Sequence, residues 1–412
     1  MESNLPLYAL GIVLFALGIC VSIALHEAGH MMTAKWFGMK VRRYFVGFGP
    51  TLFSFRRGET EYGLKAVPLG GFCDIAGMTA LDDIKPDENS RAMWRYKTWK
   101  RTVVLAAGSF THFIIGFIVL YILAVSLGLP NIDGKAQVGA LTCAKGATTT
   151  EELRTLSCEP GDPQPAKDSG VLPGDVITAV EGKPVADWSE AQEAIQRREG
   201  TVQLTVDRDG EAVPLEIEVI QVALPNAADA ESGEETTGTR QIGMIGIKVE
   251  GKFEYGPGAA VPATVAFTGE MFEHTWQALM RFPERMPKVV EAIFGGERDP
   301  DTPVSVVGAS IIGGEAAERG LWDVFLLVLA MLNFFVGVFN LLPLLPLDGG
   351  HIAITWYERV RDWFRQLRGK AAGGPVDYTK LSAVTMVVVI IGGAVVLLTV
   401  TADIVNPIHL PQ

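Results

Sequence analysis

The sequence lacks three features that would point to other classes of protein. Its 47 acidic and 35 basic residues give a net charge of −12, so it has no basic excess of the kind that binds nucleic acid. It has no apparent internal repeat, which leaves little support for a transporter built from duplicated halves. Residues 1–5 contain no Lys or Arg, so the apolar segment that follows lacks the basic start of a signal peptide. We expect that segment to be retained.

Cysteine is also scarce, with four in 412 residues. Cys20 falls in the first apolar segment and Cys73 in a basic loop, so only Cys143 and Cys158 could pair with each other. A bridge between them would add about 3 kcal/mol of stability in an oxidising compartment. Two free thiols are a nearly equal alternative.

Charged residues are missing from four long apolar segments, each close to the roughly 20 residues that a bilayer core of ~30 Å requires. The mean hydropathy of the whole chain, +0.25, is correspondingly high. The sequence therefore predicts a polytopic α-helical membrane protein with four transmembrane helices. These segments are residues 7–25, 103–129, 324–347 and 381–402.

The loops differ in charge, and this difference predicts their orientation because positively charged loops stay in the cytoplasm. Residues 35–101 carry 13 basic and 7 acidic residues, and residues 349–380 carry 6 and 3. Residues 130–323 carry 16 basic and 33 acidic residues. We expect a multi-pass protein of the inner or plasma membrane, with the two basic loops inside and with residues 130–323 and both termini outside.

The end of the first apolar segment carries His26, Glu27 and His30. Ionisable groups are costly in a bilayer, so their presence there indicates function. The two histidines are four residues apart and share one helical face, which Glu27 flanks; this is the H-E-x-x-H arrangement of zinc hydrolases. Interfacial histidines are a weaker alternative, because they would not explain the spacing. The sequence predicts a zinc protease inside a membrane, with Glu27 as the catalytic base.

A catalytic zinc ion takes three protein ligands and a water molecule. The best candidate for the third ligand is Asp348, which follows an apolar run. Pro343 and Pro346 should break the helix before it, and irregular backbone is tolerated at membrane depth only where it is buried in protein or lines a wet cavity. The alternative is that Asp348 is a surface charge at a helix end.

Residues 44–72 predict a membrane-associated β-hairpin, with strands at 51–55 and 60–67 joined by the turn Arg-Arg-Gly-Glu. An exposed strand edge beside a protease centre can bind an extended substrate through backbone hydrogen bonds. A soluble cytoplasmic hairpin is the alternative.

The exported segment contains the run Ser-Gly-Val-Leu-Pro-Gly-Asp-Val-Ile at residues 169–177, and an amphipathic helix is expected at 188–198. These features resemble the bacterial PDZ domain. The resemblance implies a groove for extended chain ends between this helix and a strand at 136–141. A spacer with an empty groove is the alternative.

Taken together, these motifs resemble the bacterial site-2 protease family of intramembrane zinc metalloproteases, and the single PDZ domain resembles its actinobacterial branch. The resemblance covers nearly the whole chain, and under it the hairpin becomes membrane-reentrant. It implies zinc held by His26, His30 and Asp348, with Glu27 catalytic and Asn340 helping to hold the substrate. It also implies that the substrates are single-pass membrane proteins. These would include anti-sigma factors already cut by a first protease, in regulated intramembrane proteolysis, and remnant signal peptides.

One position departs from the family pattern. Residues 107–112 read Ala-Gly-Ser-Phe-Thr-His, where members of the family usually carry Ala-Gly-Pro-x-x-Asn. We expect His112 to donate a hydrogen bond to the substrate as the amide would. A packed histidine without a functional role is the alternative.

The predicted organisation has four parts. The first contains two transmembrane helices and the hairpin, the second is the PDZ domain, the third holds a loop, a strand and an amphipathic helix, and the fourth contains the last two transmembrane helices and a basic loop. The boundaries of these four parts are 1–129, 130–225, 226–323 and 324–412. Residues 300–320, rich in Pro and Gly, are expected to form a loop.

A catalytically silent PDZ-containing membrane scaffold is the alternative function, and the intact Glu27 argues against it.

Overall fold

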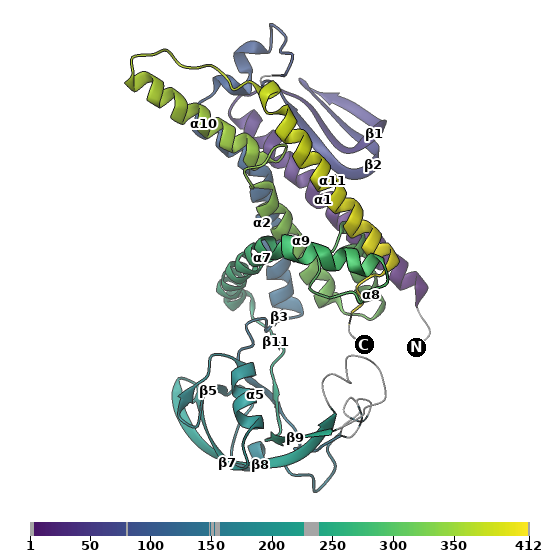
Figure 1. The fold of residues 1–412 in the computed structure, drawn as a ribbon, viewed down its shortest axis with the longest axis vertical. Helices are drawn as coiled ribbons and strands as arrows, with labels where there is room; N and C mark the ends of the chain where they lie inside the picture. The colour runs from purple at the N-terminus through teal and green to yellow at the C-terminus, as the bar shows by residue number, and fades with distance from the viewer. Residues whose placement is uncertain are drawn as a thin grey trace. The chain divides into compact units, whose positions relative to one another are not determined.

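The structure is a computed structural model that describes residues 4–79, 81–147, 149, 152, 157–225 and 239–410. The chain divides into two compact units. The first unit, residues 1–127 and 255–412, contains all the long helices and one β-hairpin, whereas the second, residues 128–254, is mostly β-sheet (Figure 1).

Four helices of the first unit are long and apolar enough to cross a membrane. Each lies at one of the four predicted segments, so the prediction of a polytopic helical membrane protein is confirmed. Only 6% to 39% of the residues in the most apolar 18-residue stretch of each helix are buried within the protein. The other residues of these stretches are therefore free to contact lipid. They are α1 (Leu5–Trp36), α2 (Thr98–Ser126), α9 (Trp322–Asn340) and α11 (Ser382–Val405).

The third of these helices ends earlier than its apolar run. The helix α9 stops at Asn340, and residues 341–347 form irregular turns before α10 (Asp348–Leu367) begins. The predicted break at Pro343 and Pro346 is therefore confirmed. The apolar run continues beyond the helix because it lines the turn that leads to Asp348.

The predicted hairpin is present and is longer than expected. Its strands β1 (Val41–Arg57) and β2 (Thr60–Ile75) pair antiparallel with several register shifts. Gly58 has a φ of 63° in the connecting turn, a conformation that favours glycine. Large apolar side chains are exposed on its outer half: Phe48, Leu52, Phe53, Phe55 and Leu64.

Two further helices complete the first unit. The helix α7 (Pro257–Ile293) contains and extends the amphipathic helix expected in this region. The helix α8 (Val306–Glu318) lies within residues 300–320, so the prediction of a loop there was wrong. Its glycines allow close packing on α1: a Cβ at Gly313 would lie 2.7 Å from the ring of Phe15. A helix made of small residues resembles a loop in composition, which explains the error.

The second unit is built around a five-stranded antiparallel sheet with strand order β6-β5-β7-β8-β9. The central part of this sheet is an antiparallel hairpin of β7 (Gly200–Arg208) and β8 (Glu211–Pro225). Their inward side chains form the core with the helix α5 (Trp188–Gln196). The other sheet strands are β5 (Val176–Val180), β6 (Lys183–Pro184) and β9 (Thr239–Met244).

Two small strand pairs join the remaining parts of this unit. The strand β4 (Val138–Leu141) pairs with β10 (Ile247–Val249), and β3 (Leu129–Pro130) pairs with β11 (Lys252–Phe253). The unit therefore extends to Glu254, past the strands that the sequence placed in the PDZ domain. Among the described residues, the short helical turns with given bounds are α4 (Pro165–Asp168), η1 (Asn89–Arg91), η2 (Met93–Arg95) and η3 (Tyr378–Lys380).

The groove beside α5 differs from the one expected. A cavity of about 310 Å³ lies along this helix, but residues 242–248 line its other side. The expected strand at 136–141 does not line this cavity, and β4 within it pairs with β10. Residues 226–238, between β8 and β9, lie outside the described residues. The assignment of the unit as a PDZ domain stays a prediction.

Cys143 and Cys158 form a disulfide, with 5.6 Å between their Cα atoms. The structure therefore contains the predicted bridge and not the alternative of two free thiols. The bridge ties the segment after β4 to the loop that follows it, within the second unit.

Candidate metal centre

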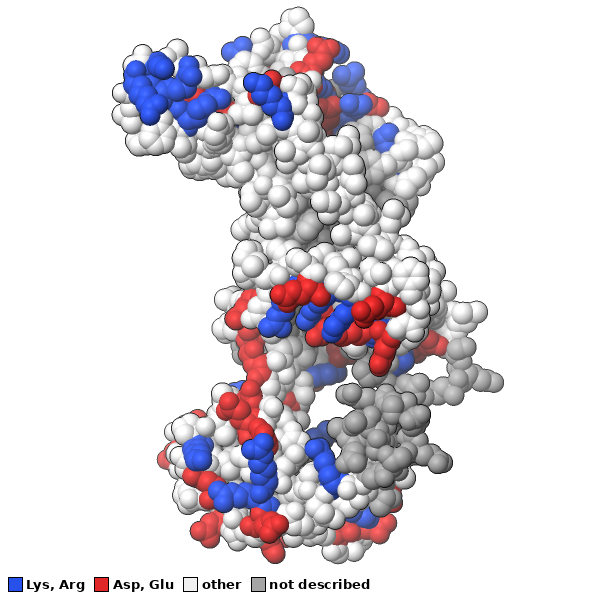
Figure 2. Space-filling model, viewed as in Figure 1, with Lys and Arg blue, Asp and Glu red and all other residues white. Residues whose placement is uncertain are grey.

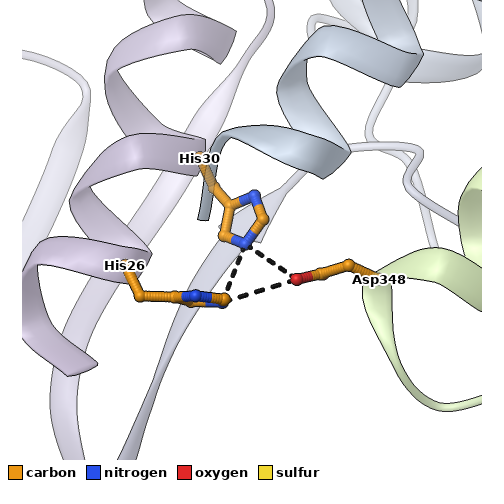
Figure 3. A group of neighbouring side chains, drawn as sticks. All are labelled: His26, His30 and Asp348. Carbon is orange, nitrogen blue, oxygen red and sulfur yellow. Dashed lines mark hydrogen bonds and ion pairs between the residues drawn. The ribbon is translucent and has the colours of Figure 1, made fainter. Parts of the chain in front are cut away.

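Three predicted ligands meet at one point of the first unit (Figure 3). His26 and His30 project from one face of α1, and Asp348 is the first residue of α10. The Nε2 atoms of the two rings are 3.1 Å apart, and each lies 3.4 Å from Oδ2 of Asp348. Segments more than 300 residues apart in the chain thus supply one cluster.

The spacing of these atoms fits a zinc ion. Around a tetrahedral zinc ion with bonds of about 2.0 Å, neighbouring ligand atoms lie roughly 3.3 Å apart. The three measured separations, 3.1, 3.4 and 3.4 Å, match that edge length. Two imidazoles and one carboxylate are also ligands that catalytic zinc sites use, with the fourth position left to water.

One of the two imidazoles is held by the backbone of the neighbouring helix. Nδ1 of His30 lies 2.7 Å from the carbonyl oxygen of Val104 in α2. Because a carbonyl only accepts, Nδ1 carries the proton and Nε2 keeps the lone pair that a metal needs. Nδ1 of His26 is buried and has no hydrogen-bond partner among the described residues.

The close approach of α1 and α2 depends on two glycines. A Cβ at Gly108 would lie 2.4 Å from Nε2 of His30 and 2.6 Å from Nε2 of His26. A Cβ at Gly29 would lie 2.7 Å from the carbonyl oxygen of Ala107. Both positions exclude any side chain. The steric role of Gly108 was not predicted, since no pattern along the chain shows which residue faces the ligands.

The side chain of Glu27 extends from α1 towards the hairpin. A Cβ at Gly71 of β2 would be 3.0 Å from Cγ of Glu27, so the strand passes directly beside this side chain. Tyr44 of β1 also holds the hairpin against α1, because its hydroxyl donates a hydrogen bond of 2.7 Å to the carbonyl oxygen of Ala24. The arrangement brings an extended backbone beside the predicted catalytic carboxylate.

His112 is buried at the same centre, with its ring centroid 5.0 Å from that of His26. Its Nδ1 lies 2.9 Å from Oδ1 of Asn333 in α9. The amide nitrogen of Asn333 already donates to the carbonyl oxygen of Leu329 at 2.8 Å, so its oxygen accepts from His112. In a neutral ring, Nε2 is then left as a hydrogen-bond acceptor.

The role of Asn333 was missed from the sequence, which has no pattern that connects α2 to α9. Asn340, the predicted substrate residue, is the last residue of α9 and is half-buried. It lies at the turn that leads to Asp348. The structure thus places Asn340 near the irregular backbone, and Asn333 inside the helix bundle.

A sequence model of peptidase family M50 matches residues 14–384, which include all three predicted ligands and nine-tenths of the chain. The chain belongs to peptidase family M50. As a member of this site-2 protease family it is a zinc metalloprotease, and zinc is its cofactor. It is also a multi-pass membrane protein.

Similar proteins agree with this M50 assignment over the full length. The chain is 47% identical over 410 residues to the zinc metalloprotease Rip1 of Mycobacterium bovis, covering 98% of this chain and all of the relative. It is 47% identical over 412 residues to the zinc metalloprotease Rip1 of Mycolicibacterium smegmatis, with the same coverage. Both units are therefore shared with these proteins.

Proposed function

We propose that this M50 peptidase binds its zinc ion through His26, His30 and Asp348 and uses Glu27 as its general base. The triangle of ligand atoms with edges of 3.1 to 3.4 Å is the observation that carries the proposal. Zinc in such a site supplies Lewis acidity, which acidifies water and polarises a peptide carbonyl. The other steps belong to residues of the chain.

Glu27 is the proton carrier of this reaction. Its carboxylate takes a proton from the attacking water and returns it to the nitrogen of the leaving amine as the peptide bond breaks. Its position on α1, one residue after His26 and beside the hairpin, puts it within reach of both the metal centre and a substrate in that space.

The substrate is a single transmembrane segment that becomes extended before cleavage. A helix keeps its carbonyl groups in internal hydrogen bonds, so the segment must unwind to expose the scissile bond. The strand edge beside Glu27 offers replacement hydrogen bonds to the extended chain. The exposed apolar residues on the outer half of β1 and β2 fit a membrane-reentrant hairpin.

His112 and Asn340 bind the substrate backbone in this proposal. With Nδ1 of His112 donating to Asn333, its Nε2 accepts from a peptide N–H. This differs from the donor role expected from the sequence, and the difference follows from the hydrogen bond to Asn333. Asn340 can donate to a substrate carbonyl from the turn before Asp348.

The remaining parts of the proposal concern topology and biology. The basic charge of residues 35–101 and 349–380 supports a topology with the metal centre towards the cytoplasm and with the second unit and both termini on the other side of the membrane. The second unit is a PDZ domain that excludes large ectodomains, so the enzyme acts on proteins shortened by a first protease. Anti-sigma factors of stress signalling, in regulated intramembrane proteolysis, and remnant signal peptides are the proposed substrates.

One experiment tests the core of this proposal. Zinc content and cleavage of a model transmembrane substrate are measured for the purified wild type and for Glu27→Gln. We expect about one zinc ion per chain in both proteins and a loss of at least about a hundredfold in cleavage rate for the variant, the scale of general-base catalysis. Undiminished cleavage by Glu27→Gln would remove the mechanism, and wild type without cleavage would favour the scaffold.

A further inference from the structure

The helix α10 leaves one face uncovered. Its large apolar side chains recur three or four residues apart along the helix, so they form a single stripe. Their exposed fractions run from 48% at Trp356 to 66% at Leu367, far above those of a packed face. The stripe consists of Trp356, Tyr357, Val360, Trp363, Phe364 and Leu367.

The opposite face of α10 is held by the protein. Glu358, which is buried, accepts from Arg101 of α2 at 2.8 Å and from the backbone N–H of Val376 at 2.8 Å. Arg365 donates to the carbonyl oxygen of Ala371 at 2.7 Å. The loop after α10 therefore covers the polar face, and the rotation of the helix about its axis is fixed with the aromatic stripe outward.

The far end of α10 carries a concentration of positive charge. Figure 2 shows basic side chains gathered where this helix ends. Arg359 lies in the second half of α10, Arg368 and Lys370 follow its last residue, and all three are exposed. Trp99 at the start of α2 is 51% exposed, and Lys100 lies 5.7 Å from its ring centroid. The start of α2, like α10, thus carries an exposed tryptophan next to a basic residue.

We propose that α10 binds the surface of an anionic lipid leaflet through its aromatic stripe and its basic end. An amphipathic helix with Trp and Phe on one side and Lys and Arg on the other is suited to the boundary between headgroups and acyl chains. Tryptophan favours that boundary, and each basic residue adds attraction to anionic headgroups. The location fits, because α10 starts at the end of the spanning helix α9 and extends away from the bundle (Figure 1).

The lipid contact bears on the metal centre because Asp348 is the first residue of α10. This step rests on the ligand role proposed for Asp348. A Cβ at Gly349 would lie 2.2 Å from the carbonyl oxygen of Leu341, and one at Gly350 would lie 2.6 Å from the carbonyl carbon of Leu344. The start of the helix is therefore locked against the turn before it. A change in the tilt of α10 would therefore move the Asp348 carboxylate relative to the two imidazoles, and ligand distances in metal sites stay within about 0.2 Å of their usual values.

The test uses the full chain in bilayers of phosphatidylcholine, with or without phosphatidylglycerol, whose acyl chains carry bromine near the headgroup. Bromine quenches nearby tryptophan, and the difference between wild type and Trp356→Phe/Trp363→Phe isolates the signal of α10. We expect this signal to be quenched more strongly in the anionic bilayer. The variant Arg359→Glu/Arg368→Glu/Lys370→Glu should lose that dependence, with a loss of at least about fivefold in lipid partitioning for each basic residue removed.

A second readout measures zinc directly. We expect zinc to leave for a chelator several-fold faster in the neutral bilayer, and in the triple variant, than in wild type with anionic lipid. The matched control reverses three exposed charges of the second unit, Lys167→Glu/Lys183→Glu/Arg240→Glu, and should change neither readout.

Equal quenching in both bilayers, or a triple variant that behaves like this control, would overturn the lipid contact. Cross-linking of two chains through Trp363→Cys would assign the stripe to a second copy, which also overturns it. If wild type holds no zinc, the proposed function fails, but the quenching comparison still reports on lipid binding. The two failures are therefore distinguishable.

Discussion

The two units of this M50 peptidase distribute polar and apolar side chains in opposite ways. In the second unit, Leu204 and Ile217 are fully buried in a conventional apolar core. In the first unit, exposed apolar residues cover the spanning helices, while His26, His112 and Asn333 are buried among them. The contrast follows from the solvent: water drives apolar groups inward, whereas lipid accepts them and leaves polar groups to satisfy one another inside the protein.

Buried ion pairs show the same contrast. Arg298 and Asp403 of the first unit are both almost completely buried, and Asp403 also accepts from the backbone N–H of Ser305. Asp175 of the second unit is buried but pairs with Arg208, whose side chain is 29% exposed. Water therefore reaches one partner of the pair in the second unit, whereas both partners of the pair in the first unit are shielded from solvent.

The largest effect is expected from removing the carboxylate of Asp348, the proposed third ligand in the first unit. We expect Asp348→Ala to lose its zinc and all measurable cleavage, because a catalytic site needs three protein ligands. The second unit has its own core and should keep its thermal stability. Metal analysis and a proteolysis assay of the second unit check both parts. Retention of tightly bound zinc would show that Asp348 is not a ligand.

The next effect comes from adding a single methyl group in the first unit. Gly108→Ala would place a Cβ against both imidazoles, so we expect zinc affinity to fall by about ten- to a hundredfold, as for losses of supporting structure around a metal. Competition with a chelator measures this. The control is Gly393→Ala in α11, where a Cβ meets nothing within 4 Å and where zinc binding should not change.

A cavity in the core of the second unit should have a smaller and separate effect. We expect residues 128–254 to fold by themselves, and Leu204→Ala to lower their free energy of unfolding by about 3 kcal/mol. Urea denaturation measures the difference, with the half-exposed Leu172→Ala as the control that changes little. In the full chain Leu204→Ala should leave zinc bound, and loss of the metal would show that the units are not independent.

The disulfide should add a similar or slightly smaller amount to the free energy of unfolding of the second unit. Its closure of a 15-residue separation predicts a loss of about 3 kcal/mol for Cys143→Ser/Cys158→Ser in the isolated second unit, or upon reduction of the wild type. Because Cys143 lines the cavity beside α5, reduction should also loosen that end of the groove. Unfolding curves that coincide with and without reductant would contradict this.

The smallest effect is a dependence on pH in the second unit. Burial alone would raise the pKa of Asp175, but hydrogen bonds from Arg208 and from the backbone of Leu172 hold that pKa below its usual value. A carboxylate with a lowered pKa in the folded state stabilises it above the pKa of the unfolded chain, and this contribution disappears as the pH falls through the folded value. Asp175→Asn should therefore reduce stability at neutral pH and flatten its decrease in acid. Asp168→Asn, at an exposed position, should retain the wild-type pH profile.

Several features could be read along the chain because they depend on local spacing. The four spanning helices follow from uninterrupted apolar runs, and the shared face of His26 and His30 follows from the helical period. The prolines before Asp348 predicted the end of α9. The helix α8 was missed because its small residues lack an amphipathic pattern, and it is stabilised by packing against α1.

The tertiary structure alone decided which distant groups meet. The 3.4 Å separation between Asp348 and the two imidazoles, the hydrogen bond from His112 to Asn333 and the close approach of Gly108 to both imidazoles join helices that are far apart in sequence. The sequence by itself determined which segments are apolar enough to span a membrane and that His26 and His30 share one helical face, because hydrophobicity and helical period are properties of neighbouring residues. It offered Asp348 only as the best candidate for a third ligand. Contacts between helices depend on how their surfaces fit, and a linear pattern does not contain that information.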